Sequence, residues 1–288
     1  MKIILSSNPY RDKGLRAAKA AEHILRSAGV ETRMCLPFAF ENTGSADLLK
    51  DIKFSEMSEE LASSDMLICF GGDGTILHAA KDATENKIPI LGVNMGSVGF
   101  MAELEHSELS QLLKLTTGKY AVETRMMLDV MVKREGKVVY EDLALNDAVM
   151  TKGAVARIVD LSVYGDGVLI SDFGGDGVIV STPTGSTAYS MAAGGPIVEP
   201  TAESIIITPI CAHALQAKSF VLGRDRTVEV RTEKYNRKSV YLSVDGGKAF
   251  KLSGGDRVVI RRSEKTTRLV RLTDKSFYTI VSEKLGKG

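Results

Sequence analysis

The hydrophobic pattern of this 288-residue chain changes its period near residue 118. Before that point, short apolar runs alternate with segments whose apolar residues recur every three or four positions, as in βαβ units. After it, short strand-like runs are separated by Gly and Asp, which favours antiparallel structure. The sequence therefore predicts an α/β domain with a parallel sheet over residues 1–118 and a β-rich, sandwich-like domain over residues 119–264.

Individual elements follow from the same pattern. In the first part, strands are predicted over residues 2–7, 31–37, 66–70 and 88–94, and helices over residues 15–28, 75–87 and 106–118. The second part has one segment with a helical pattern, residues 186–195. A final helix is predicted over residues 276–285, and segment 265–288 is a candidate to return to the first domain.

Composition restricts the partners. A formal net charge of +1 gives no general bias towards nucleic acid or membrane, so any anion site must be built locally. Cys35, Cys69 and Cys211 lie far apart without CxxC spacing, which favours free thiols in a reducing compartment over disulfides or zinc. The apolar N-terminal run is too short for a signal peptide, and no run is long enough to span a membrane. We expect a cytoplasmic protein without metal-ligating residues of its own.

The segment FGGDGTILHAA, residues 70–80, places three glycines around one aspartate directly after an apolar strand. Glycines between a strand and a helix leave backbone N–H groups for an anion such as phosphate. Neither a Walker A motif nor GxGxxG is present, and no lysine follows the glycines. A carboxylate beside phosphates is unfavourable unless it accepts a proton, so Asp73 is predicted to be a general base. The alternative is a tight turn in which Asp73 only caps the helix.

Two polar segments of the second part could bind a nucleotide. Asn146 and Asp147 end an alternating strand, and an adjacent amide and carboxylate can bind a ribose diol or an adenine edge. The alternative there is an Asx turn. The segment STPTGSTAYS, residues 181–190, offers hydroxyl groups to sugar or phosphate oxygens and one aromatic face. Its alternative is a polar loop in which Ser186 caps the short helix.

These segments together resemble the NAD kinase family. GGDGT, residues 71–75, is shared with diacylglycerol and sphingosine kinases and, with a final serine, with phosphofructokinases. LALNDAVM, residues 143–150, resembles the family's Asn-Glu/Asp motif, and residues 176–200 resemble its longest block almost throughout. The lipid kinases and phosphofructokinases lack the second and third segments, and the order and separation of all three match the NAD kinases.

The resemblance implies transfer of a phosphoryl group to the 2′-hydroxyl of the adenosine ribose of NAD, and activity on NADH is a further expectation. The donor would be ATP, another nucleoside triphosphate or polyphosphate, with Mg²⁺ carried by the nucleotide. Small molecules would be the ligands, with no nucleic acid and no membrane, and we expect a homo-oligomer, either a dimer or a tetramer. The alternatives are a diacylglycerol-type lipid kinase of the same superfamily and a non-catalytic NAD(P)-binding sensor.

The resemblance also assigns residues. The catalytic residue is Asp73, and the residues that bind nucleotide or dinucleotide are Gly71, Gly72, Asp73, Gly74, Thr75, His78, Phe100, Asn146, Asp147, Arg157, Gly174, Asp176, Thr184, Thr187, Ala188, Tyr189, Ser190, Met191 and Ala192. From local sequence alone, His78 and Arg157 would be ordinary surface side chains and Asp176 part of a turn. Residues 244–247, VDGG, predict a hairpin turn outside the site.

Position 174 departs from the family, which often has a basic residue two positions before the aspartate that corresponds to Asp176. Gly174 removes a positive charge near the nicotinamide end. Because the oxidised ring is cationic and the reduced ring is neutral, we expect relaxed selection between NAD and NADH, and between ATP and polyphosphate.

Overall fold

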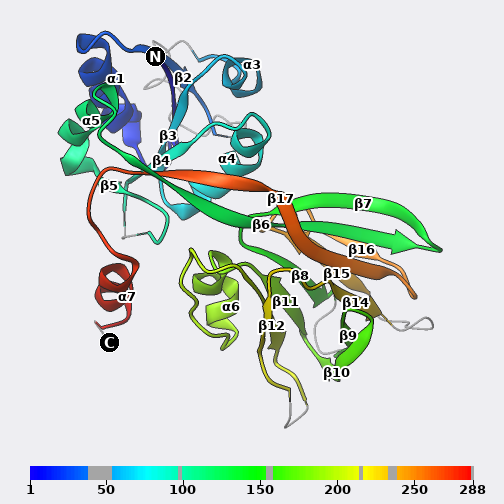
Figure 1. Cartoon of the computed structure of the whole chain (residues 1–288). Helices are drawn as coiled ribbons and strands as arrows, with labels where there is room; N and C mark the ends of the chain where they lie inside the picture. Colours follow the sequence, from blue (N-terminus) through cyan, green and yellow to red (C-terminus); the bar gives the residue numbers. More distant parts are fainter. Residues whose placement is uncertain (38–53, 97–98, 154–157, 214–216, 233–238, 287–288) are drawn as a thin grey trace. The chain divides into compact units, whose positions relative to one another are not determined.

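The computed structural model describes residues 1–37, 54–96, 99–153, 158–213, 217–232 and 239–286 (Figure 1). Contacts divide the chain into two compact units, residues 1–124 with 267–288, and residues 125–266. Strands β6 (Ala121–Arg134) and β17 (Arg257–Arg271) contribute residues to both units. The predicted fold class is confirmed, because the first unit is α/β with a parallel sheet and the second is built of antiparallel strands.

The sheet of the first unit has the strand order β2-β1-β3-β4. These strands are β1 (Lys2–Ser7), β2 (Glu31–Cys35), β3 (Met66–Gly71) and β4 (Ile90–Asn94), all parallel. The end of β17 and the short β5 (Leu104–Glu105) also pair with β4 in parallel. Every residue of β3 and β4 is buried, as in strands covered on both faces.

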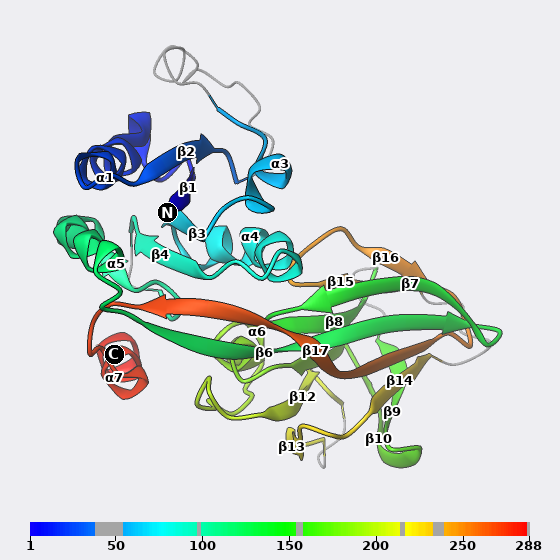
Figure 2. The same ribbon diagram turned by 45° about the horizontal axis from the view of Figure 1, so that its top comes forward.

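Helices cover both faces of this sheet (Figure 2). One face packs against α1 (Arg16–Ser27), the 3₁₀ helix η2 (His106–Leu112) and α5 (Leu113–Thr116). The other side carries α3 (Met57–Leu61) and α4 (Asp73–Glu85). A short 3₁₀ turn, η1 (Lys13–Leu15), precedes α1. The helix predicted over residues 106–118 consists of η2, a 3₁₀ helix, followed by the short α5.

The second unit is a sandwich of two antiparallel sheets. One has the order β10-β9-β14-β17-β6-β7 and the other β13-β12-β11-β8-β15-β16. The strands not yet given are β7 (Lys137–Ala144), β8 (Asp147–Lys152), β9 (Val159–Gly165), β10 (Val168–Gly175), β11 (Gly177–Ser181), β12 (Ser204–Ile210), β13 (Phe220–Gly223), β14 (Val228–Thr232), β15 (Val240–Val244) and β16 (Phe250–Leu252).

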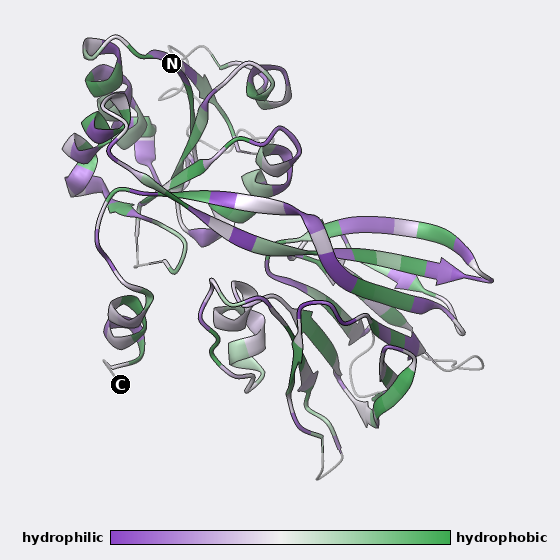
Figure 3. Cartoon of the chain, in the orientation of Figure 1, coloured by the Kyte–Doolittle hydropathy of each residue, from purple (hydrophilic) through white to green (hydrophobic). Residues whose placement is uncertain are grey.

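Alternate residues of both sheets form the sandwich core. Leu128 and Val130 of β6 and Val178 and Val180 of β11 belong to one buried cluster, at the spacing of two that puts side chains on one face. Figure 3 shows the corresponding alternation of hydrophilic and hydrophobic residues along the long strands. On the outer face of β11, Ile179 packs with residues of β8 and β12 and with Ala193, next to α6 (Tyr189–Ala192). The short helix therefore packs on the outside of the second sheet.

Three hairpins of the second unit turn through an acidic residue followed by glycine. The pairs Glu135-Gly136, Asp166-Gly167 and Asp245-Gly246 all have positive φ, with values of 49° and 81°, 49° and 82°, and 49° and 71°. Positive φ at both central positions matches the right-handed twist of the flanking strands. The turns predicted at residues 135–136 and 244–247 are confirmed.

A buried carboxylate fixes the C-terminal segment to the first unit. Glu103 is 4% exposed and accepts hydrogen bonds from the backbone N–H of Leu272 at 2.8 Å and of Thr273 at 2.6 Å. It also pairs with Arg271 at 3.2 Å. The helix beyond, α7 (Phe277–Leu285), places Lys284 Nζ 4.2 Å from the ring centroid of Phe100. No helix in the described residues is long and apolar enough to cross a membrane.

Replacing this carboxylate should destabilise the first unit. In Glu103→Ala the arginine and two amides lose a buried partner, so we expect the free energy of unfolding to fall by about 2 to 4 kcal/mol. Urea unfolding followed by circular dichroism measures this, with Glu59→Ala on the exposed surface of α3 as the control. Equal midpoints for the two variants would contradict the anchoring role of Glu103.

Candidate active site

Asp73 does not cap the helix that it begins. The N-cap of α4 is Gly72, and no side chain accepts a hydrogen bond at this end. The carboxylate of Asp73 instead accepts hydrogen bonds from two backbone N–H groups, Phe100 N at 2.8 Å and Met101 N at 3.0 Å. Its two oxygens offer about four acceptor positions, so capacity remains for a further proton. The capping alternative is therefore wrong.

The glycines around Asp73 have two different explanations. A Cβ at Gly71 would collide with the side chain of Thr75, and a Cβ at Gly99 would collide with the carboxylate of Asp73. Neither Gly72 nor Gly74 has a described atom within 4 Å of such a Cβ, and neither has positive φ. Packing thus requires Gly71 and Gly99, whereas Gly72 and Gly74 leave open space beside the first turn of α4.

The other residues predicted in the first unit occupy different environments. Thr75 is 3% exposed, and its Oγ1 accepts a hydrogen bond from Asn8 Nδ2 at 3.4 Å. His78 lies exposed on α4. Phe100 is 8% exposed, and its backbone N–H, rather than its ring, contacts Asp73. Asn8 was not among the predicted site residues, because an Asn-Pro pair directly after a strand is typical of an ordinary turn.

In the second unit, Asp245 organises the Asn146–Asp147 turn. Its carboxylate accepts hydrogen bonds from three successive backbone N–H groups, Leu145 at 2.7 Å, Asn146 at 2.8 Å and Asp147 at 2.9 Å. From sequence, Asp245 was predicted to lie outside the site, because Asp followed by Gly is a common hairpin turn. Asp245 forms that turn and also reaches a segment about 100 residues earlier in the chain.

Burial raises the pKa of both carboxyl groups of this turn. Burial, with a smaller contribution from the charge of Asp245, raises the pKa of Asp147 to about 7. Burial also raises the pKa of Asp245, partly offset by the three N–H groups that its carboxylate accepts. Asp147 therefore titrates near neutral pH.

Asn146 carries a buried polar atom without a partner among the described residues. Its Oδ1 is inaccessible to solvent and accepts no hydrogen bond there. Its backbone carbonyl accepts from Thr182 N at 2.9 Å, and a Cβ at Gly185 would collide with the same carbonyl. The backbone of Asn146 is thus fixed, while its buried side-chain oxygen has no hydrogen-bond partner among the described residues.

The loop from Thr184 to Ala192 contains buried and accessible residues. Thr184 is 5% exposed and accepts a hydrogen bond from Arg125, while Ser190 is fully buried and bonds to Thr208 at 2.9 Å. These two hydroxyls therefore hold the loop and do not face open solvent. Thr187, Ala188 and Met191 are partly buried, and Tyr189 and Ala192 are exposed.

The alternative given for this loop, in which Ser186 caps the short helix, is wrong. The N-cap of α6 is Ala188. Ser186 Oγ donates to Pro183 O at 2.7 Å and accepts from Val198 N at 3.0 Å. The hydroxyl thus closes the loop on itself.

Asp176 and Gly174 lie near the other end of β8. Asp176 precedes β11 and pairs with Lys152, with 2.6 Å between Oδ1 and Nζ. Gly174 lies in β10, opposite Asp160 of β9. Arg157 lies outside the described residues. From Asp147 to Lys152 the strand advances five residues, or about 17 Å at the usual rise.

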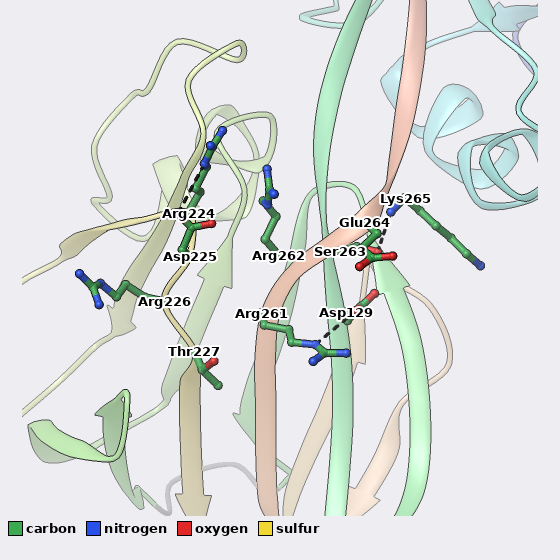
Figure 4. A pocket seen from close by; sticks show the side chains of 10 residues that line it. All are labelled: Asp129, Arg224, Asp225, Arg226, Thr227, Arg261, Arg262, Ser263, Glu264 and Lys265. Carbon is green, nitrogen blue, oxygen red and sulfur yellow. Dashed lines mark hydrogen bonds and ion pairs between the residues drawn. The ribbon is translucent and has the colours of Figure 1, made fainter.

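A cavity of about 570 Å³ in the second unit contains none of the predicted site residues (Figure 4). Its arginines are largely neutralised, since Arg224 and Arg262 both pair with Glu203 and Arg261 pairs with Asp129. The lining residues are Asp129, Arg224, Asp225, Arg226, Thr227, Arg261, Arg262, Ser263, Glu264 and Lys265. The lining by itself does not identify a ligand.

Comparison with known proteins identifies the family of this chain. Residues 19–120 match the family model described as the ATP-NAD kinase N-terminal domain, and residues 145–272 match the ATP-NAD kinase C-terminal domain. An NAD kinase of Acetivibrio thermocellus is 35% identical over 286 residues, which cover 99% of this chain and 97% of the relative. One of Symbiobacterium thermophilum is 44% identical over 222 residues, 77% of this chain and 78% of the relative. The chain belongs to the NAD kinase family.

Solved structures agree with this assignment. An NAD kinase from Archaeoglobus fulgidus in complex with ATP is 26% identical, with a TM-score of 0.75 and coverage of 100% of both chains. Yeast NADH kinase complexed with NADH has a TM-score of 0.85 and covers 99% of this chain and 87% of its own. At 24% identity, the likeness to the yeast protein concerns the fold alone.

The raised pKa of Asp147 predicts a pH-dependent stability. Because the folded state holds this proton more tightly than the unfolded state, the resulting stability is fully present below about pH 4 and is lost as the pH rises through about 7. Asp147→Asn avoids the loss. Its free energy of unfolding relative to wild type should rise by roughly 1 kcal/mol per pH unit over this range and then level off.

Urea unfolding at several pH values measures the difference, with Asp225→Asn, whose side chain is 77% exposed, as the matched control. A difference between Asp147→Asn and wild type that does not change with pH would show that Asp147 is ionised normally.

Proposed function

We propose that the protein transfers the terminal phosphoryl group of a nucleoside triphosphate to the 2′-hydroxyl of the adenosine ribose of NAD, with Asp73 as the general base. The observation that carries the proposal is the environment of Asp73. Two N–H groups orient its carboxylate, and two glycines beside it leave space that no described side chain fills. A hydroxyl nucleophile needs a base that is positioned in this way.

The proposed reaction moves one proton and one phosphoryl group. Asp73 accepts the proton of the 2′-hydroxyl, the ribose oxygen forms a bond to the γ-phosphorus, and the bond from phosphorus to the bridging oxygen breaks to release the diphosphate. Backbone N–H groups at Gly72 and Gly74 and the first turn of α4 would bind phosphate oxygens. These groups bind without adding a side-chain charge.

We propose that Mg²⁺ arrives with the nucleotide. In the described residues, no group of three or more His, Cys, Asp or Glu gathers as metal ligands. Mg²⁺ commonly keeps several waters and binds substrate phosphates together with one or two carboxylates, so the residues present fit a metal carried by the donor. When bound, it would neutralise charge that develops on the phosphates.

The second unit supplies the dinucleotide contacts in this proposal. Asn146 and Asp147 would bind the adenosine ribose, where the unsatisfied Asn146 Oδ1 needs a donor. Asp176, about 17 Å along the strand direction, would bind the nicotinamide end. The accessible residues of the loop, Thr187 and Tyr189, would contact the dinucleotide, while Thr184 and Ser190 support the loop.

The two alternatives are less well supported. A lipid kinase needs an apolar groove for its substrate, whereas the Asn146–Asp147 turn and the loop beyond Ser181 are polar. A non-catalytic sensor would gain nothing from a carboxylate beside phosphates. Membership of the NAD kinase family also favours catalysis.

We further propose a cytoplasmic homo-oligomer, a dimer or a tetramer. The three cysteines are free, and burial raises the pKa of Cys35 to about 11 and that of Cys69 to about 12. Buried thiols of this kind are inert and suit a reducing compartment. Sedimentation velocity measures the assembly, and a single species of about 31 kDa, the mass of one chain, would contradict it.

Removal of the proposed base should slow the chemical step. In Asp73→Asn we expect kcat to fall by about 10² to 10⁴, with NAD binding largely kept, because an amide cannot accept the proton. Initial rates of NADP formation with NAD, ATP and magnesium measure this. Asp82→Asn, on the exposed side of the same helix, is the matched control. Near-normal turnover of a folded Asp73→Asn protein would exclude the role of Asp73.

Asn146 should act on binding rather than on chemistry. Asn146→Ala removes a hydrogen bond that costs about 1 to 3 kcal/mol to lose, so the KM for NAD should rise by about one to two decades. The KM for ATP should change little. Equal increases in both constants, or no increase in either, would place Asn146 outside the dinucleotide site.

A further inference from the structure

A carboxylate, that of Asp160, lies beside Gly174. A side chain at this position would start 3.1 Å from Asp160 Oδ1 and 3.2 Å from Ile158 Cδ1, measured from an ideal Cβ. Any basic residue there would therefore begin beside a carboxylate in the neighbouring strand. The effect of glycine at position 174 depends on which other charges face the nicotinamide end of the proposed site.

A cation from another strand meets Asp176. Lys152, the last residue of β8, places Nζ 2.6 Å from Asp176 Oδ1, and its backbone N–H donates to Asp176 O at 3.0 Å. The ladder between β8 and β11 brings the two together, because Thr151 is the partner of Gly177. The side chains are 26% and 32% exposed, so the pair is only partly screened by water.

This pair changes the charge that a nicotinamide ring would meet. An unpaired carboxylate attracts the cationic oxidised ring and has no such attraction for the neutral reduced ring. A carboxylate paired with an ammonium group presents almost no net charge but keeps acceptor positions for the carboxamide N–H of either form. The presence of Lys152 thus removes most of the Coulomb preference for the oxidised form.

We infer that Lys152 is a specificity-determining residue of the dinucleotide site, which neutralises Asp176 and so allows both NAD and NADH to be phosphorylated. The inference rests on the proposed function and extends it to the reduced dinucleotide. It adds a second determinant of redox-form selection to position 174 in β10, namely the pair formed by Lys152 of β8 and Asp176, the residue before β11.

The test measures the ratio of kcat/KM for NAD to kcat/KM for NADH at fixed ATP and magnesium. Lys152→Gln leaves Asp176 unpaired, so the ratio should rise by about 3- to 10-fold. Asp176→Asn leaves the lysine unpaired, so the ratio should fall by a similar factor. The double variant should return close to the wild-type ratio, although its rates with both substrates are lower.

Two further variants separate charge from packing. Lys152→Arg keeps the charge and should keep the wild-type ratio. Lys251→Gln removes a positive charge from β16, in an exposed position, and should leave the ratio unchanged. A purely structural role for Lys152 would instead lower both kcat/KM values equally in Lys152→Gln, and an unchanged ratio in that variant would overturn the inference.

Binding measurements distinguish failure of this inference from failure of the proposed function. Calorimetric dissociation constants for NAD and NADH, without a phosphoryl donor, should show the same opposite shifts in Lys152→Gln and Asp176→Asn. Absence of NADP formation by the wild-type protein would contradict the proposed function. Shifts of equal sign in the two variants would contradict the role of Lys152, whether or not the protein phosphorylates NAD. If Lys152→Gln does not fold, comparison of the double variant with Asp176→Asn isolates the lysine, and the ratio should be higher in the double variant; equal ratios would overturn the role of Lys152.

Discussion

Hydrogen bonds from backbone N–H groups to partly or fully buried carboxylates hold the loops that carry the proposed site. Asp73 accepts two such bonds, Asp245 three and Glu103 two. Removing a carboxylate from water costs several kcal/mol unless it is hydrogen-bonded, so each of these groups must be met by donors. Because the donors belong to segments distant in the sequence, satisfying the carboxylate also fixes the distant segment. The same requirement thus stabilises the fold and orients the site.

Small residues are needed wherever a backbone comes this close. Gly99 lies against the carboxylate of Asp73, Gly71 lies against Thr75, and Gly185 lies against the carbonyl of Asn146. A methyl group at any of these positions would force backbone or side-chain movement. Gly72 and Gly74 differ, because nothing described in the protein would obstruct a side chain there. Their open surroundings leave room for the phosphate contacts proposed for them.

Much of the architecture was predictable because it is local. The period of the apolar residues predicted the strands β1 and β3 and the helices α1 and α4, and the acidic-glycine pairs predicted two of the hairpin turns. The helix predicted over residues 106–118 is present over residues 106–116, but apolar spacing did not show that most of it is a 3₁₀ helix. The motifs that identified the family are also contiguous segments, and a single sequence displays them completely.

The sequence by itself determined the two kinds of unit, the family and the identity of the acidic and amide residues proposed to act on the substrate. Only the tertiary structure decided what those residues contact. It showed that Asp73 is held by Phe100 and Met101 rather than serving as a cap, that Asp245 organises the turn of Asn146, and that Lys152 meets Asp176. The physical reason is that hydrogen bonds and ion pairs depend on distances of about 3 Å, which strand pairing and loop closure set between residues far apart in the chain.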